Sequence, residues 1–199
     1  MKKIIALVLV LVTALALTAC SLFKKDGGTT DGSATIDDYN DAIAATTPTT
    51  ATIRTTYRNT APEATLEGEY IVTYNIDGTA TVNYTYDSLA PIGSPEMIEK
   101  KTGKVDVLAN GTVSGDLDKV VAAAAVNSIK LDGKKIEYDI SMGVLNAVVK
   151  AENTKDVFGV DLGADAALDM RITGDGRIGS YSINYATSAG RAYIVCIYN

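Results

Sequence analysis

Residues 69–86 read EYIVTYNIDGTATVNYTY, and this stretch decides the fold. On both sides of Asp77-Gly78, apolar and aromatic side chains alternate with polar ones. Such a period of two is typical of β-strands with one buried face, and an Asp-Gly pair between two of them favours a tight hairpin turn. We therefore expect two antiparallel strands that share an inner face. Its members would be Tyr70, Val72, Tyr74, Val82, Tyr84 and Tyr86.

Three further turn signals extend the prediction to a whole antiparallel meander. They are Asn110-Gly111, Asp132-Gly133 and Asp175-Gly176, each between two apolar runs. Residues 188–190 then turn the chain into a last strand, residues 191–198, which is apolar on both faces. Because such a strand has to be covered on both sides, we expect packing against both faces of the sheet.

A helix is predicted at the start of this domain. Thr35 and Asp38 have the spacing of a capping box, in which each residue satisfies a backbone N–H of the other. Ile36, Tyr39 and Ile43 then fall on one face of the helix. Pro48 lies beyond the helix and ends it.

A second helix is predicted between the two halves of the meander. Residues 114–116 (Ser-Gly-Asp) are a start signal, and the apolar residues from Leu117 to Ala124 have helical spacing. Residues 144–151 are predicted as a strand, and residues 153–159 as a polar crossing with one helical turn. The whole pattern predicts an α+β domain, mainly β, over residues 35–199. We expect a curved antiparallel meander sheet, or half-barrel, packed with one N-terminal helix and one inserted helix.

The first twenty residues predict a secretory leader. A basic start is followed by the apolar run Ile4–Leu17, which is shorter than the roughly 20 residues that span a bilayer as a helix. Residues 17–20 read LTAC and resemble the lipobox of bacterial lipoproteins, whose cysteine is acylated before the leader is removed. The resemblance implies that residues 1–19 are a lipoprotein signal peptide. It also implies that lipidated Cys20 anchors the chain to the bacterial cell membrane, on its extracytoplasmic side.

The segment after the predicted anchor is polar. Residues 21–34 read SLFKKDGGTTDGSA, a composition typical of flexible linkers, so we expect residues 20–34 to hold the lipidated cysteine and a tether. The second cysteine, Cys196, then has no partner for a disulfide. Its apolar neighbours predict a buried thiol.

The composition excludes several classes of function. The chain has no histidine, which removes mechanisms that need imidazole. Its formal charge of −6 would become −8 once Lys2 and Lys3 left with the leader, and such a surface repels phosphate backbones, so no nucleic acid is expected. No phosphate loop, metal-ligand spacing or set of nucleophile, base and oxyanion donor is evident. We expect no enzyme activity, no catalytic residues, no metal and no cofactor. A hydrolase would need carboxylates or Ser-Lys pairs that only folding brings together.

The order of the predicted elements resembles the LolA-like lipoprotein-carrier fold and its LppX-type lipoprotein relatives. The closing pattern MRITGDGRI at residues 170–178, followed by Ile183-Asn184-Tyr185, adds to the resemblance. It implies a half-barrel whose concave face holds helices over an apolar cavity, and a hydrophobic or lipid-like ligand in that cavity. Candidate lining residues are the six inner-face residues named above.

The alternative is a structural or protein-interaction module of the cell envelope. In this reading the interior is solid, no ligand binds, and an outer face or edge strand docks an envelope protein. An apolar void of several hundred cubic ångströms would favour ligand binding, whereas close packing throughout would favour the module. The sequence determines neither the ligand nor the protein partner. It also leaves open the oligomeric state and the number of membranes of the host.

Overall fold

A computed structural model describes residues 34–60, 63–88, 99–115, 117–188 and 190–199. The predicted leader, Cys20 and the predicted tether up to residue 33 lie outside the described residues. Residues 34–199 form one compact unit, and its buried hydrophobic residues run from Ile36 to Cys196. Because this unit contains its own core, we expect it to fold without the leader.

Most of the unit is a nine-stranded antiparallel sheet, which confirms the predicted fold class. Two meanders, β1–β4 and β5–β9, join where β1 pairs with β9, so the order is β4-β3-β2-β1-β9-β8-β7-β6-β5. The strands of the first meander are β1 (Thr50–Thr60), β2 (Glu63–Tyr74), β3 (Ala80–Ser88) and β4 (Glu99–Val107). Those of the second are β5 (Ile136–Ser141), β6 (Val144–Val149), β7 (Ala166–Ile172), β8 (Ile178–Ala186) and β9 (Gly190–Tyr198).

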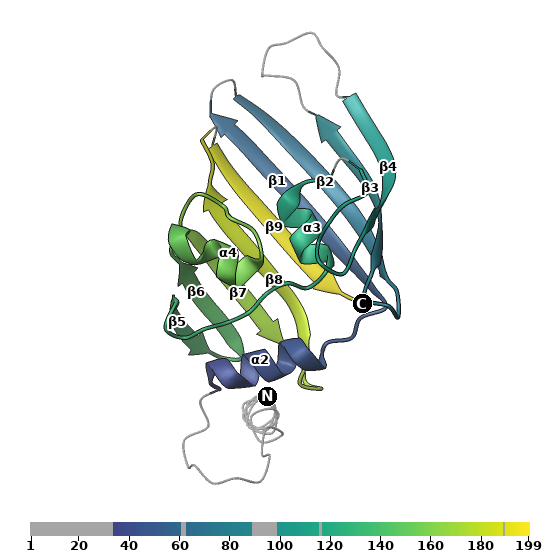
Figure 1. The fold of residues 1–199 in the computed structure, drawn as a ribbon. Helices are drawn as coiled ribbons and strands as arrows, with labels where there is room; N and C mark the ends of the chain where they lie inside the picture. Colours follow the sequence, from purple (N-terminus) through teal and green to yellow (C-terminus); the bar gives the residue numbers. More distant parts are fainter. Residues whose placement is uncertain (1–33, 61–62, 89–98, 116, 189) are drawn as a thin grey trace, which may run out of the picture. The chain divides into compact units, whose positions relative to one another are not determined.

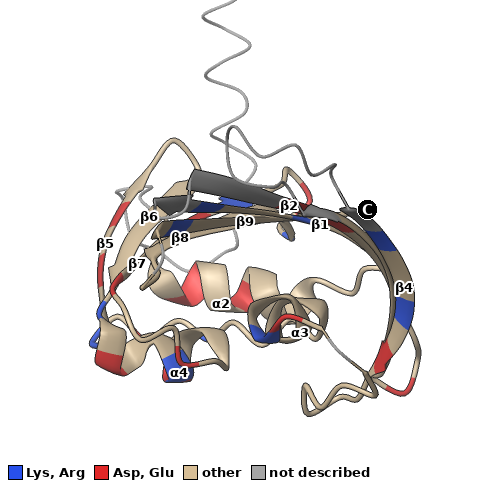
Figure 2. Ribbon diagram, turned by 90° about the horizontal axis from the view of Figure 1, so that it is seen from above, with Lys and Arg blue, Asp and Glu red and all other residues tan. Residues whose placement is uncertain are grey.

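The helices lie on the concave side of the curved sheet (Figures 1 and 2). They are α2 (Ile36–Ala45), α3 (Lys119–Ala125) and α4 (Thr154–Phe158), and a 3-10 turn, η1 (Ala151–Asn153), precedes α4. No described helix covers the convex face. There, Tyr193 and Ile197 of β9 are 45% and 37% exposed, so the prediction that both faces of the last strand are covered is wrong. The inward side chains of β9, Ala192, Ile194 and Cys196, are buried.

Two of the predicted hairpins are confirmed. Asp77-Gly78 joins β2 to β3 and Asp175-Gly176 joins β7 to β8. In both turns the glycine has a positive φ, +81° at Gly78 and +78° at Gly176, which L side chains rarely adopt. Asn110-Gly111 also forms a turn, but it leads only to an isolated bridge between Val107 and Val113.

The hairpin predicted at Asp132-Gly133 is wrong. Residues 129–131 pair with no strand; instead Leu131 exchanges two hydrogen bonds with the side chain of Asn40 on α2, at 2.9 and 3.1 Å. The N–H of Lys130 donates to the carbonyl of Val157 on α4 at 2.9 Å. The segment therefore crosses the concave side, and its backbone is bound by the helices.

The first predicted helix is confirmed in detail. Thr35 and Asp38 form the capping box, and Ile36 and Tyr39 are buried. At its other end, the hydroxyl of Thr46 accepts the N–H of Ile178 at 2.8 Å, which fixes α2 to the start of β8.

The second predicted helix exists but begins later than expected. Its N-cap is Asp118, whose carboxylate accepts the N–H groups of Val120 and Val121. Ser114, part of the expected start signal, pairs instead with Asp106 of β4: its N–H donates to the Asp106 carbonyl, and its hydroxyl accepts the Asp106 N–H. The strand predicted over residues 144–151 is β6, and the crossing predicted over 153–159 contains α4.

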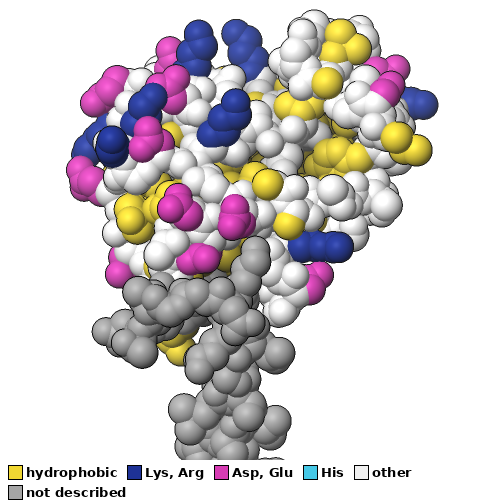
Figure 3. All heavy atoms as spheres, turned by 60° about the horizontal axis from the view of Figure 1, so that its bottom comes forward, with side chains coloured by type: hydrophobic (Ala, Val, Ile, Leu, Met, Phe, Trp, Pro, Cys, Tyr) yellow, Lys and Arg dark blue, Asp and Glu magenta, His cyan; other side chains and the backbone are white. Residues whose placement is uncertain are grey.

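The thiol of Cys196 is free and buried, as predicted. Burial raises its pKa to about 12. Seen from the α2 end, the surface carries acidic and basic side chains close together, with smaller hydrophobic areas between them (Figure 3). Within the described part of the chain, no helix has the length and hydropathy needed to cross a membrane.

Candidate functional site

A pocket of about 700 Å³ lies on the concave side of the sheet, among the helices and the loops that join them. We call it the helix pocket. Its walls come from the turn at 109–113, from Leu117 and α3, from residues 126–130 after α3 and from residues 155–160 around the end of α4. Its apolar lining residues are Ala109, Val113, Leu117, Ala122, Ala123, Val126 and Val160.

Helix α3 presents different faces to the sheet and to the pocket. Val120, Val121 and Ala124 are buried, and α3 packs on β1. Lys119 and Ala123, on other faces of the helix, line the pocket. Two residues of the alanine run, Ala122 and Ala123, thus lie along one wall of the pocket.

The start of α3 is bound to the sheet by one polar contact. The hydroxyl of Tyr57 on β1 donates to the carboxylate of Asp118 at 2.9 Å. Burial, and secondarily the charge of Asp118, raises the pKa of Tyr57 well above its usual value. The phenol therefore stays protonated and acts as a donor to the N-cap.

Ser128, which also lines the pocket, joins α3 to α4. Its hydroxyl lies 3.0 Å from the carbonyl of Ala123 and 2.6 Å from the carbonyl of Phe158. Gly159 ends α4 with φ +76°, and a Cβ at this position would lie 2.7 Å from the Ser128 hydroxyl. Both the backbone angle and the close approach therefore require glycine here.

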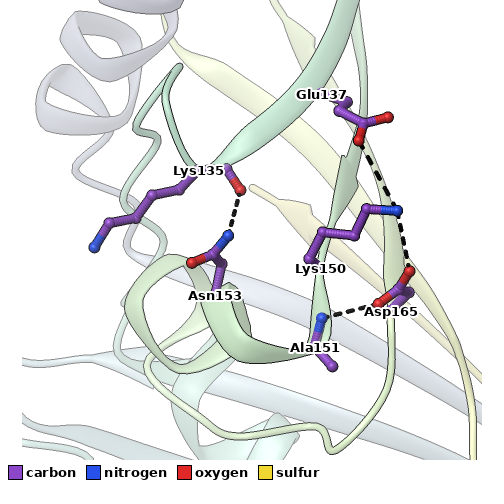
Figure 4. Close-up of polar contacts among 6 residues, drawn as sticks. All are labelled: Lys135, Glu137, Lys150, Ala151, Asn153 and Asp165. Carbon is purple, nitrogen blue, oxygen red and sulfur yellow. Dashed lines mark hydrogen bonds and ion pairs between the residues drawn. The ribbon is translucent and has the colours of Figure 1, made fainter.

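Polar contacts also hold η1 and α4 against the second meander (Figure 4). Asp165 accepts the N–H of Ala151 at 2.9 Å and the ammonium of Lys150 at 3.3 Å, and Lys150 lies 3.9 Å from Glu137. The Ala151 N–H, followed by Lys150, lowers the pKa of Asp165.

The amide of Asn153 adds a second connection to β5. It donates to the carbonyl of Lys135 at 3.0 Å, just before that strand begins. Thr154 is fully buried and accepts the N–H of Leu162 at 3.1 Å. Hydrogen bonds between side chains and backbone therefore hold both the start of α4 and the residues that follow it.

Where the helices meet the sheet, little space remains. The space lined there by Val120, Ala124, Phe158, Tyr181, Ile183 and their neighbours is about 10 Å³, about the volume of a single water molecule. This space is too small for a ligand, and the larger volume is the helix pocket.

The six predicted lining residues lie together on the inner side of β2 and β3 but line neither of these two pockets. Tyr70 pairs with Tyr84, and Val72 pairs with Val82. Tyr70, Val72 and Val82 are buried in the core, and Tyr74 and Tyr84 pack against it partly buried. A role for these residues in ligand binding remains a prediction.

Two tyrosines of this group, Tyr70 and Tyr84, lie over glycines. A Cβ on Gly103 would collide with the ring of Tyr84, its partner across the β3–β4 pair, and one on Gly68 would lie 2.7 Å from the ring of Tyr70. The Tyr84 and Tyr86 rings stack at 5.9 Å. Because Gly68 and Gly103 have no side chains, the rings of Tyr70 and Tyr84 can lie along the sheet.

The sequence prediction missed the helix pocket. One signal for it was present: the alanines of the second helix are too many to fit only the face toward the sheet. The described residues contain no group of three or more Cys, Asp and Glu side chains suited to a metal ion.

Comparisons with known proteins show limited similarity. No family model matches the chain, and no curated sequence matches it. Among solved structures, it is similar to LprF from Mycobacterium bovis, with a TM-score of 0.40 and 12% identity, over 81% of this chain and 89% of that one. It is also similar to mFAP1, a redesigned β-barrel bound to DFHBI, with a TM-score of 0.23 and 12% identity, over 76% and 94%. At such TM-scores, neither likeness bears on what this chain binds.

Proposed function

We propose that this chain is an extracytoplasmic lipoprotein, anchored through Cys20, that binds a hydrophobic, lipid-like ligand in the helix pocket. The anchor rests on the lipobox-like LTAC at residues 17–20. We place the ligand in the helix pocket, which has a volume of about 700 Å³. The space beside Val120 and Phe158, between helices and sheet, is only about 10 Å³.

The observation that carries this proposal is the combination of volume and lining. A volume of about 700 Å³ falls within the usual range for small-molecule sites. Seven of its sixteen lining residues are alanine, valine or leucine, and the other nine are polar residues or glycine. Alanine, valine and leucine side chains supply the apolar wall. Asp118 and Ser128 fix α3, and Asp165 fixes η1 beside α4, so the wall does not have to be assembled by the ligand.

A second candidate function, an envelope interaction module, is favoured by the convex face. There Tyr193, Val195 and Ile197 point outward along β9. Ile71 of β2, which is 41% exposed, lies on the same face but across β1, with Thr52 between it and Ile197. A row of apolar side chains on an uncovered sheet is a feature of protein-docking surfaces.

Filling the pocket tests the first candidate. Ala123→Trp places an indole at the pocket wall, and Ala167→Trp places one on the exposed face of β7 as the matched control. In the chain from Ser21 to Asn199, we expect A123W to bind the neutral probe Nile red at least about tenfold more weakly than wild type. A167W should bind like wild type. Equal binding by A123W and wild type, with unchanged circular dichroism, would contradict the proposal.

A further inference from the structure

We infer that the helix pocket selects amphiphiles with an anionic head group, held by Lys119, Lys130 and Lys155 at its rim. This inference rests on the proposed function. All three lysines line the pocket. They come from α3, from the segment that follows it and from α4, and the fold brings them around one volume.

The charge around the pocket is positive, although the chain as a whole is acidic, with a formal charge of −6. Asp156 is the carboxylate among the lining residues, and Lys135, outside the pocket, pairs with it at 2.5 Å. None of the three lining lysines forms an ion pair with another described residue. Lys135 is the stronger partner of Asp156 and the main cause of the lowered pKa of that carboxyl, and Lys155, which lies next to Asp156, helps to lower it. The charges of the three lysines can therefore interact with a ligand.

The backbone of each lysine is fixed by the elements that form the pocket. Lys119 is the first residue of α3, directly after the N-cap that binds Tyr57. Lys130 is held through its N–H, which donates to Val157 at 2.9 Å, and Lys155 is the second residue of α4. The long side chains remain exposed and adjustable, so they can reach a head group at the mouth of the pocket.

The neighbouring side chains point to an amphiphile rather than a small anion. Leu117, Val126 and Val160 lie in the same pocket and offer an apolar surface for a chain. Lysine is a compact point charge and does not impose the fixed geometry of an arginine fork. The site therefore fits a carboxylate, phosphate or sulfate head group and depends on its charge more than on its shape.

The test compares two ligands of equal chain length, decanoate and decan-1-ol, by calorimetric titration of residues 21–199. The triple variant K119Q/K130Q/K155Q removes the rim charges. Its matched control, K104Q/K134Q/R171Q, removes three exposed charges outside the pocket. We expect the first variant to bind decanoate about tenfold more weakly and decan-1-ol unchanged, because exposed ion pairs are individually weak but act together. The control variant should bind both ligands like wild type.

Salt and inorganic phosphate complete the test. Added salt should weaken decanoate binding to wild type more than binding to the triple variant, since salt screens exposed charges. Equal affinity of wild type and triple variant for decanoate would overturn the inference and leave the proposed function standing. Phosphate binding as tight as decanoate binding would replace the amphiphile with a free anion. If wild type bound neither decanoate nor decan-1-ol, the proposed function itself would fail.

Discussion

The hydroxyl of Tyr57 donates a hydrogen bond of 2.9 Å to the carboxylate of Asp118. Asp118 is also the N-cap of α3, so a single carboxylate joins the sheet to the helix that forms one wall of the pocket. The helix begins at Lys119, directly after this residue.

Replacing Asp118 should loosen α3. We expect Asp118→Ala to lower the free energy of unfolding by about 1–2 kcal/mol, because it removes the helix cap and the acceptor for Tyr57. Asp118→Asn keeps a capping oxygen and should cost less. Urea unfolding measures both. Equal losses for the two variants would show that the cap does not set the stability of α3.

A methyl group on Gly103 should be costly because the ring of Tyr84 occupies that space. We expect Gly103→Ala to destabilise the fold by about 1–3 kcal/mol, the usual range for overpacking. Gly174, with nothing within 4 Å of an added Cβ, provides the control, and Gly174→Ala should be near neutral. Most of the cost at Gly103 should disappear in a Tyr84→Ala background; additive losses would contradict the contact.

Acid should weaken the attachment of η1 through Asp165. Its pKa is lowered in the folded protein by the Ala151 N–H and then by Lys150, so its stabilising effect is complete above the ordinary carboxyl pKa of 3.8. That effect is lost as the pH falls through the lower pKa of the folded state. The difference in urea midpoint between wild type and Asp165→Asn should therefore be largest near neutral pH and shrink as the pH falls below the ordinary carboxyl pKa of 3.8. A difference that did not change with pH would be inconsistent with this ion pair.

The predicted anchor can be tested apart from the pocket. In the native host, Cys20→Ser should prevent incorporation of labelled palmitate and release the chain from the membrane fraction, because the acyl chains supply the anchoring energy. Cys196→Ser, the matched control at the buried thiol, should leave both unchanged. Membrane association that survived Cys20→Ser would remove the lipoprotein part of the proposal.

Local signals predicted much of the fold. The capping box at Thr35 and Asp38 fixed the first helix, and Asp-Gly pairs fixed two hairpins, because cap and turn chemistry depend on residues close in sequence. The hairpin predicted at Asp132-Gly133 is absent, because local turn chemistry does not determine whether strands form on both sides of the turn. There the local turn forms, with Lys135 donating to the Asp132 carbonyl, but no strand precedes it because distant helices bind that backbone.

The helix pocket could not be read from the sequence because its parts meet only in the folded chain. Lys119, Lys130 and Lys155 belong to no motif, and their common neighbourhood depends on the crossing segment and on Ser128, which joins α3 to α4. The pairing of β1 with β9 is likewise long-range. The inner-face tyrosines, in contrast, followed directly from the alternation along β2 and β3.

Native mass spectrometry of the chain purified from its own membranes tests the central claim most directly. We predict that wild type carries a bound hydrophobic molecule that survives transfer into the gas phase, that A167W carries it too, and that A123W has lost it. A wild-type chain without such a molecule, or an A123W chain that retained it, would contradict ligand binding in the helix pocket.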